Sequence, residues 1–228
     1  MTGYHVWRRL LAAAALTAMV AVTAPAVTAL AATTADRDPV VFVHGYQGNS
    51  SSFYEMIADF KRDGYTDSQL YAWDYFSSQS NKTIAQQFAK YVDGVLAKTG
   101  ASKVDIVGWS MGGINTRWYL KALGGTAKVD DYASLGTPHH GTNWAYGCPD
   151  IPCFEMRPDS AFMKELNAGD ETPGAVHYGS WWSPCDELVI PHESPVLAGA
   201  TNTKTGCISH FAFGTDDTVS AQVRAFVR

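Results

Sequence analysis

Apolar residues follow two spacings along the chain from Pro39 onward. Continuous apolar and β-branched runs, typical of strands buried on both faces, cover four segments: Pro39–Val43, Leu70–Asp74, Val104–Val107 and Val129–Leu135. Apolar residues at helical spacing predict three helices between them: Ser50–Asp63, Asn81–Gly100 and Met111–Leu123. Weaker patterns predict two strands and two helices further on: strands at Val176–Ser180 and Thr201–Thr205, a short helix capped by Asp159 and ending at Leu166, and a closing helix over Thr218–Val227.

Strands that alternate with amphipathic helices are typical of βαβ units. The pattern therefore predicts an α/β fold with a mostly parallel central sheet and helices on both of its faces. The chain of 228 residues is long enough for one domain with a sizeable core, and no second domain is indicated. The segment between Gly136 and Pro158 is rich in loop-forming residues.

The first 31 residues have the pattern of a secretory signal peptide. Arg8 and Arg9 precede an apolar run, Leu10–Val22, and an A-x-A site follows at Ala29-Leu30-Ala31. The apolar run is shorter than the roughly 20 residues that span a bilayer. We therefore expect residues 1–31 to be cleaved, residues 32–228 to form a single catalytic domain, and the protein to be secreted and extracellular. The sequence leaves open whether export uses the general or the twin-arginine route.

Charge argues against a nucleic-acid partner. The chain has 17 basic and 22 acidic residues, a net charge of −5, and no cluster of Lys and Arg follows residue 31. Loss of the signal peptide with its two arginines would bring the net charge to about −7, which favours a protein that is soluble outside the cell.

The cysteines indicate disulfides rather than a metal. Four cysteines lie after the expected cleavage site, and an even number in an exported chain is typical of two disulfides. Of the three possible pairings we favour the one that joins neighbours along the chain, Cys148–Cys153 and Cys185–Cys207. No C-x-x-C spacing supports zinc. We expect neither a metal nor an organic cofactor.

The segment Gly108-Trp109-Ser110-Met111-Gly112 matches G-x-S-x-G between a buried strand and a helix. In that setting the motif is a nucleophile elbow, in which a strained turn presents the serine hydroxyl. Residues two positions to either side must lack a side chain, because they would collide with the adjoining strand and helix. Ser110 is therefore the predicted nucleophile.

An oxyanion hole is expected from two backbone amides. One belongs to the residue after the nucleophile, Met111, and the other to the loop that follows the first strand, His44-Gly45-Tyr46-Gln47-Gly48. By position the second donor is the amide of Tyr46, with the amide of Gln47 as the alternative. His44 precedes the serine in the chain, and we expect it to brace this loop.

A serine nucleophile needs a base, and in this architecture the order along the chain is Ser, acid, His. His210, between the last predicted strand and the closing helix, is the expected base, and His192 is the alternative. His177 falls in a predicted strand. His139 and His140 precede any late acid, and we expect them to line the mouth of the cleft.

Asp186 is the expected acid, since it follows a predicted strand and precedes His210 by 24 residues. Glu187 and Asp170 are the alternatives. Cys185 and Cys207 flank this acid and this base, so a bridge between them would tie the two loops together. We expect that bridge to maintain the acid–base geometry.

With these residues in place, the chain resembles the small secreted bacterial triacylglycerol lipases of the α/β-hydrolase fold, the compact group without a large lid. The segments PVVFVHGYQGN, KVDIVGWSMGG and SPCDELVIP carry the likeness. The resemblance implies the same nucleophile, acid, base and oxyanion donors. Trp109 departs from it, because the family often has His there, and we expect only a change in packing. The region Gly136–Gly174 is also longer than in the smallest members, and is either a miniature lid or a wall of the acyl groove.

The expected reaction is hydrolysis of carboxylic esters, with triacylglycerols as the favoured substrates, through an acyl-enzyme. The alternatives are a short-chain carboxylesterase, a cutinase-like polyesterase, a phospholipase A and, in another class, a non-catalytic lipid-binding module. The expected partner is a small-molecule or lipid ester, met by a monomer that binds transiently at a lipid–water interface. Five aromatic residues could give the cleft an apolar rim: Trp144, Tyr146, Phe154, Trp181 and Trp182.

Overall fold

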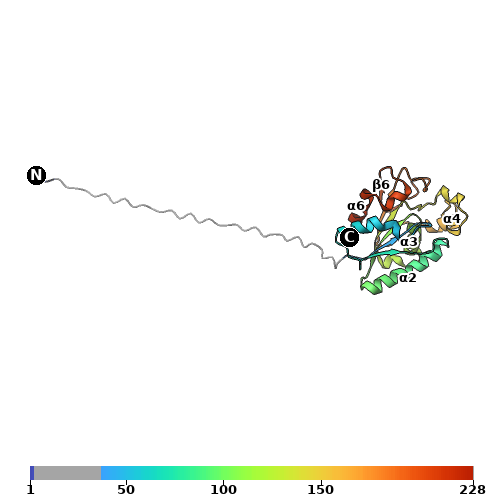
Figure 1. Cartoon of the computed structure of the whole chain (residues 1–228), viewed down its shortest axis with the longest axis horizontal. Helices are drawn as coiled ribbons and strands as arrows, with labels where there is room; N and C mark the ends of the chain where they lie inside the picture. Colours follow the sequence, from blue (N-terminus) through green and yellow to red (C-terminus); the bar gives the residue numbers. More distant parts are fainter. Residues whose placement is uncertain (3–36, 228) are drawn as a thin grey trace. The chain divides into compact units, whose positions relative to one another are not determined.

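The computed structural model of the chain describes residues 1–2 and 37–227 (Figure 1). The expected signal peptide and its cleavage site lie outside the described residues, apart from Met1 and Thr2. Residues 37–227 belong to one compact unit. Among the described residues, no helix combines the length and the apolar character that a membrane span requires.

The centre of this unit is one six-stranded sheet in which every neighbouring pair is parallel. The strand order is β2-β1-β3-β4-β5-β6. The strands are β1 (Val40–Val43), β2 (Leu70–Trp73), β3 (Val104–Trp109), β4 (Val129–Leu135), β5 (His177–Trp182) and β6 (Thr201–Lys204). The predicted parallel α/β architecture is confirmed. The strand β3 runs two residues beyond the predicted end and stops directly before Ser110.

Helices cover both faces of the sheet, as predicted (Figure 1). Consecutive side chains of β1 alternate between two cores: Val41 and Val43 lie in one, Val40 and Phe42 in the other. The first core also contains residues of α2 (Asn81–Thr99) and α3 (Met111–Ala122), and the second contains residues of α1 (Tyr54–Arg62) and α6 (Asp217–Phe226). This two-sided burial explains why the strands have continuous apolar runs.

Two local predictions need correction. The loop-rich segment before Pro158 contains a helix that the pattern did not predict, α4 (Ile151–Met156), which begins inside the Cys148–Cys153 disulfide loop. The short helix α5 (Ala161–Leu166) is capped by Ser160, whose hydroxyl accepts a hydrogen bond from the Met163 amide at 3.0 Å. Asp159, the predicted cap, instead accepts a hydrogen bond from the Tyr146 hydroxyl at 2.8 Å.

Candidate active site

Ser110 lies in the turn between β3 and α3, at the carboxyl end of the sheet. Its backbone has φ 55° and ψ −127°, a conformation that a residue with a side chain rarely adopts. Such strain persists only where the surroundings hold it. The sharp turn places the hydroxyl at the edge of a pocket instead of in the core.

The neighbouring glycines make this turn possible because other segments approach them closely. A Cβ atom at Gly112 would lie 2.2 Å from the Val43 carbonyl oxygen, and one at Gly108 would lie 2.8 Å from the Cα of Gly113. A Cβ at Gly45 would lie 2.8 Å from the Cβ of Ser110 itself. The oxyanion loop and the nucleophile turn therefore touch, and no larger residue fits between them.

The structure brings Ser110, His210 and Asp186 together from three separate segments. His210 Nε2 lies 2.8 Å from Ser110 Oγ, and His210 Nδ1 lies 2.8 Å from Asp186 Oδ2. Asp186 and His210 are both buried. Because a carboxylate only accepts, Nδ1 carries the proton, which leaves Nε2 to accept from the serine hydroxyl. The second oxygen of Asp186 accepts from the amides of Leu188 and Val189, each at 2.9 Å, which fixes the carboxylate plane.

The other candidate histidines within residues 37–227 have partners other than Ser110. The Nδ1 atom of His192 lies 3.3 Å from the Val189 carbonyl oxygen. On β5, His177 pairs with Asp131. The prediction that His139 and His140 line the cleft mouth is wrong. His139 is fully buried against Ser134, where burial lowers its pKa well below the ordinary value.

His140 pairs with Glu171 and with the Ser194 carbonyl. Of this loop, the pocket lining contains Pro138 instead of the two histidines. The chain turns inward after Pro138, which carries the imidazole of His139 into the core.

The alternative acids have other partners. The carboxylate of Glu187 accepts a hydrogen bond from the His210 backbone amide at 2.9 Å, so this residue holds the main chain of the base. Asp170 accepts from the Thr172 amide with its side chain and from Lys121 with its backbone carbonyl. Glu187 therefore supports the base, and Asp170 lies apart from it.

A disulfide and side-chain hydrogen bonds connect the loop that contains Asp186 with the loop that contains His210. A disulfide joins Cys185 with Cys207, with 5.0 Å between the Cα atoms. The second disulfide joins Cys148 with Cys153, so both bridges connect neighbours along the chain. The Ser183 hydroxyl donates to the Ile208 carbonyl at 2.6 Å and accepts from the Ile208 amide at 3.1 Å.

Trp109 has a role in the site that the sequence did not reveal. Its indole N–H donates to the His210 carbonyl at 3.1 Å, and the two ring centroids lie 5.4 Å apart. Packing alone was expected at this position. Trp109, the residue before Ser110, thus holds the backbone of His210, which lies 101 positions later in the chain.

The oxyanion loop is a tight turn with one free amide. The Gly48 amide donates to the Gly45 carbonyl at 3.1 Å, and Gln47 has a φ of 55°, as the third residue of a type II turn requires. The amide of Gln47, the alternative oxyanion donor, is engaged by the Ser77 hydroxyl at 2.9 Å. Within the described part of the chain, the Tyr46 amide has no hydrogen-bond acceptor. The Met111 amide is the first of α3, where a helix leaves its N–H groups unpaired.

His44 braces this loop. Its Nδ1 lies 2.8 Å from the Gly45 carbonyl oxygen, and its ring stacks on Tyr75 at 4.1 Å between centroids. The Tyr75 hydroxyl in turn donates to the His44 carbonyl at 2.6 Å. Burial lowers the pKa of His44, which favours the neutral imidazole that such a bracing role requires.

A pocket of about 390 Å³ opens beside Ser110. Besides Ser110, His210 and the oxyanion loop, its lining includes seven apolar side chains: Trp109, Pro138, Trp144, Met156, Leu188, Val189 and Phe211. No Lys, Arg, Asp or Glu is among the described residues that line it.

Only one of the five aromatic residues expected at the rim, Trp144, lines this pocket. Trp181 is buried and donates to Gln222, and Trp182 lies under Lys204. Tyr146 and Phe154 flank the guanidinium of Arg157. Trp181 and Trp182 are consecutive residues of β5, so their side chains lie on opposite faces of the sheet and neither lines the pocket.

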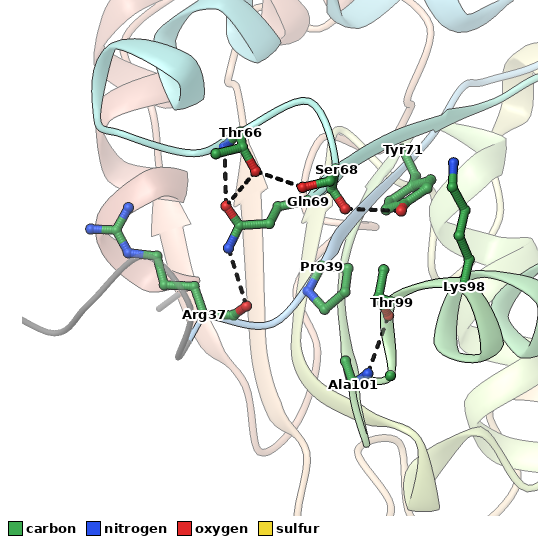
Figure 2. A pocket seen from close by; sticks show the side chains of 10 residues that line it. Arg37, Pro39, Thr66, Ser68, Gln69, Tyr71, Lys98, Thr99 and Ala101 are labelled. Atoms are coloured by element: carbon green, nitrogen blue, oxygen red, sulfur yellow. Dashed lines mark hydrogen bonds between the residues drawn. The ribbon is translucent and has the colours of Figure 1, made fainter.

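A second cleft, of about 510 Å³, lies at the opposite end of the sheet (Figure 2). Pro39 and Gln69, which directly precede β1 and β2, contribute to its lining. Its polar groups bond to one another: the Gln69 side chain accepts from Thr66, and the Tyr71 hydroxyl donates to the Ser68 carbonyl, as Figure 2 shows. Ligands of open α/β sheets bind at the carboxyl ends of the strands, so the chemistry is expected at the Ser110 pocket.

No group of three His, Cys, Asp or Glu side chains is placed to hold a metal ion within the described ranges.

Comparison with known proteins finds similarity to lipases. Residues 37–146 match the family model of class 2 lipases. The triacylglycerol lipase of Burkholderia plantarii is 33% identical over 136 residues, which cover 56% of this chain and 37% of that protein. The triacylglycerol lipase of Pseudarthrobacter phenanthrenivorans is 32% identical over 126 residues, which cover 51% of this chain and 38% of that protein. The chain thus spans little more than a third of the length of these relatives.

Solved structures show the fold. The mature form of the Bacillus licheniformis lipase BlEst2 superposes with a TM-score of 0.74 at 21% identity, over 84% of this chain and 93% of that one. Aspergillus fumigatus lipase B superposes with a TM-score of 0.69 at 18% identity, over 82% and 52%. The predicted resemblance to bacterial triacylglycerol lipases is confirmed, and the chain has the α/β-hydrolase fold.

Proposed function

We propose that this chain is a secreted serine lipase or esterase that hydrolyses neutral carboxylic esters, triacylglycerols among them, with Ser110, His210 and Asp186 as its triad. The observation that carries the proposal is the continuous hydrogen-bonded series from Ser110 Oγ to His210 Nε2 and from His210 Nδ1 to Asp186, 2.8 Å at each step. A strained serine at the mouth of a pocket, in contact with an imidazole and a buried carboxylate, has the arrangement of an activated nucleophile.

The reaction follows from these positions. His210 Nε2 takes the proton of Ser110 as the serine oxygen bonds to the ester carbonyl carbon, and Asp186 stabilises the imidazolium. The carbonyl oxygen becomes an oxyanion, held by the amides of Tyr46 and Met111. The tetrahedral intermediate then collapses, and His210 returns the proton to the departing alcohol. A water molecule, deprotonated by His210, attacks the acyl-enzyme, and a second collapse frees the acid and restores the serine.

The pocket favours an uncharged acyl group. Its described lining holds no formally charged side chain, and Trp144, Met156 and Leu188 give it apolar walls. Burial of an alkyl chain there is favourable by about 0.8 kcal/mol for each methylene group. Two aromatic side chains of the lining are also open to solvent: Phe211 is 64% exposed and Trp144 38%. Together they offer an apolar contact for a lipid–water interface, which a monomer would meet transiently.

The two disulfides support an extracellular location, because such bonds persist in oxidising compartments. This agrees with cleavage of residues 1–31 as a signal peptide and with a single catalytic domain over residues 32–228.

The test is hydrolysis of a nitrophenyl ester series of rising acyl length, followed by an emulsified triacylglycerol. We expect turnover of both, and a fall in kcat of about 10⁴ or more in Ser110→Ala. Ser68→Ala, in the second cleft, is the matched control and should keep the activity of the wild type. An Ser110→Ala protein with near wild-type turnover would refute the proposed mechanism.

A further inference from the structure

The hydroxyl of Tyr46 makes a contact that the proposed reaction does not use. It donates a hydrogen bond to the carboxylate of Asp150, 104 positions later in the chain. The Ser78 hydroxyl donates to the same oxygen of Asp150 at 2.8 Å, and the Gln47 side-chain amide donates to the Tyr46 hydroxyl at 3.1 Å. The hydrogen bonds from Tyr46 and then from Ser78 lower the pKa of Asp150, so the carboxylate stays ionised around neutral pH.

Asp150 lies inside a small covalent loop. The Cys148–Cys153 disulfide closes a separation of five residues around it, and its carbonyl accepts from the amides of Cys153 and Phe154, at 3.0 and 3.2 Å. Its side chain forms no cap hydrogen bond with α4, so the carboxylate is left to face Tyr46 and Ser78. The loop therefore presents one fixed acceptor to the oxyanion turn.

The segment from Cys148 to Met156 is anchored at a second point. Glu155 accepts from the Ser80 hydroxyl and from the Asn81 backbone amide, each at 2.6 Å, and from the Asn81 side chain at 2.8 Å. Ser80 directly precedes α2, a long helix of the core, and Asn81 is its first residue. A segment held in this way at two points is a firm support for the turn that it contacts, and its last residue, Met156, lines the pocket.

The oxyanion turn needs support of this kind. Gln47 has a positive φ, which costs a residue with a side chain about 1 kcal/mol or more, and such strain persists only where neighbours over-determine it. Besides the turn's own hydrogen bond and the bracing of His44 by Tyr75, contacts from other segments hold its two central residues. Ser77 accepts from the Gln47 amide, Asp150 accepts from the Tyr46 hydroxyl, and the Trp144 ring lies against the Tyr46 ring at 6.3 Å between centroids. The amide of Tyr46 can stabilise an oxyanion only if the residue itself is fixed.

We propose that Asp150 is a positioning residue for the oxyanion hole, which acts by anchoring the Tyr46 side chain to the loop closed by the Cys148–Cys153 disulfide. This inference rests on the proposed function, since it assigns a task within that reaction. Asp150 makes no contact with the substrate in this scheme. It fixes the direction of the Tyr46 amide. The hydrogen bond from this amide to the substrate oxygen is stronger in the transition state than in the ground state.

The test compares Asp150→Ala and Tyr46→Phe with the wild type, each normalised by titration of the active serine with a fluorophosphonate. Complete loss of one oxyanion donor costs about 10²–10³ in kcat, so loosening it should lower kcat about tenfold and leave KM within about twofold. The inhibition constant of an alkyl boronic acid, which forms a tetrahedral adduct with the serine, should rise by the same factor. Because both substitutions break one contact, the double variant should lose little more than the worse single variant.

Asp159→Ala is the matched control. Asp159 accepts from a tyrosine hydroxyl in the same way, Tyr146 at 2.8 Å, but this pair has no contact with the oxyanion loop. We expect this variant to keep the kcat and the boronic acid affinity of the wild type.

The outcomes separate the two proposals. A wild type that hydrolyses the ester, with Asp150→Ala and Tyr46→Phe equal to it in kcat and boronic acid affinity, would overturn the positioning role and leave the proposed function intact. A lowered melting temperature of these variants, with unchanged kcat and inhibition constant per titrated serine, would also overturn the positioning role, since it indicates a structural role alone. A wild type that neither turns over esters nor reacts with the fluorophosphonate would overturn both.

Discussion

The buried carboxyl group of Asp105 should make the stability of the fold depend on pH. Asp105 lies near the amino end of β3, and Ser110 follows the carboxyl end of the same strand. Asp105 is fully buried near the start of that strand, where its Oδ1 accepts from the Asp131 amide at 3.1 Å. Its Oδ2 has no hydrogen-bond donor within the described residues. Burial and then the nearby Asp131 carboxylate raise the pKa of Asp105 from 3.8 to about 9. The folded protein therefore keeps a proton that the unfolded chain releases.

The sign and size of the effect follow from these two pKa values. Below pH 3.8 both states are protonated, and above about pH 9 both are ionised. Between these limits unfolding releases one proton, so stability is lost as the pH rises, by about 1.4 kcal/mol for each pH unit. From pH 5 to pH 8 the group should remove about 4 kcal/mol from the free energy of unfolding. For a chain of this size that is a fall in melting temperature of about 10 °C.

Asp105→Asn tests this directly, because asparagine has nearly the same shape and cannot ionise. Urea unfolding at pH 5, 6, 7 and 8 should show a shallower pH slope for the variant, whose relative stability is greatest at pH 8. Asp93→Asn, at an exposed position of α2 paired with Lys128, should keep the slope of the wild type. Equal slopes for the wild type and Asp105→Asn would refute the assignment of a buried, protonated carboxyl.

Two further predictions concern the support of the base. Removal of the disulfide in the double variant Cys185→Ala, Cys207→Ala should lower stability by about 3 kcal/mol on the chain-entropy model, and kcat severalfold, since other hydrogen bonds still connect the two loops; unchanged melting temperature and activity would contradict this. Trp109→Phe leaves the His210 carbonyl without its donor and should lower kcat about three- to tenfold. Trp181→Phe, which loses an indole donor away from the pocket, should keep wild-type kcat, and equal effects of both changes would argue against a specific role.

Much of the fold could be predicted from the local pattern of apolar residues. The continuous apolar run at Val40–Val43 predicted a strand buried on both faces, and alternate side chains of that strand do enter two separate cores. The turn at Ser110 could be predicted because its requirement is local: a Cβ atom at Gly108 or Gly112 would lie less than 3 Å from a backbone atom of another residue. The order of acid and base along the chain then restricted the choice to a few late residues.

What the sequence did not reveal depends on side chains that meet across long separations. Tyr46 and Asp150 lie 104 positions apart in the chain, and Trp109 lies 101 positions from His210. The spacing of apolar residues along the sequence does not predict such contacts. Helix α4 was missed because it has only six residues, too few for a helical pattern, and is held by a disulfide and by the Glu155 contacts. The prediction that His139 lines the cleft was wrong because its neighbour Pro138 lines the pocket while the His139 side chain is buried, and the sequence does not show this change of direction.

The central claim is that Ser110 is a nucleophile activated by His210. It is tested most directly by incubating the protein with an alkyl fluorophosphonate and locating the adduct by peptide mass spectrometry. We expect one adduct for each chain, on Ser110, with none in Ser110→Ala and a labelling rate lowered by orders of magnitude in His210→Ala. Active protein that takes up no label, or takes it up at another residue, would contradict the account.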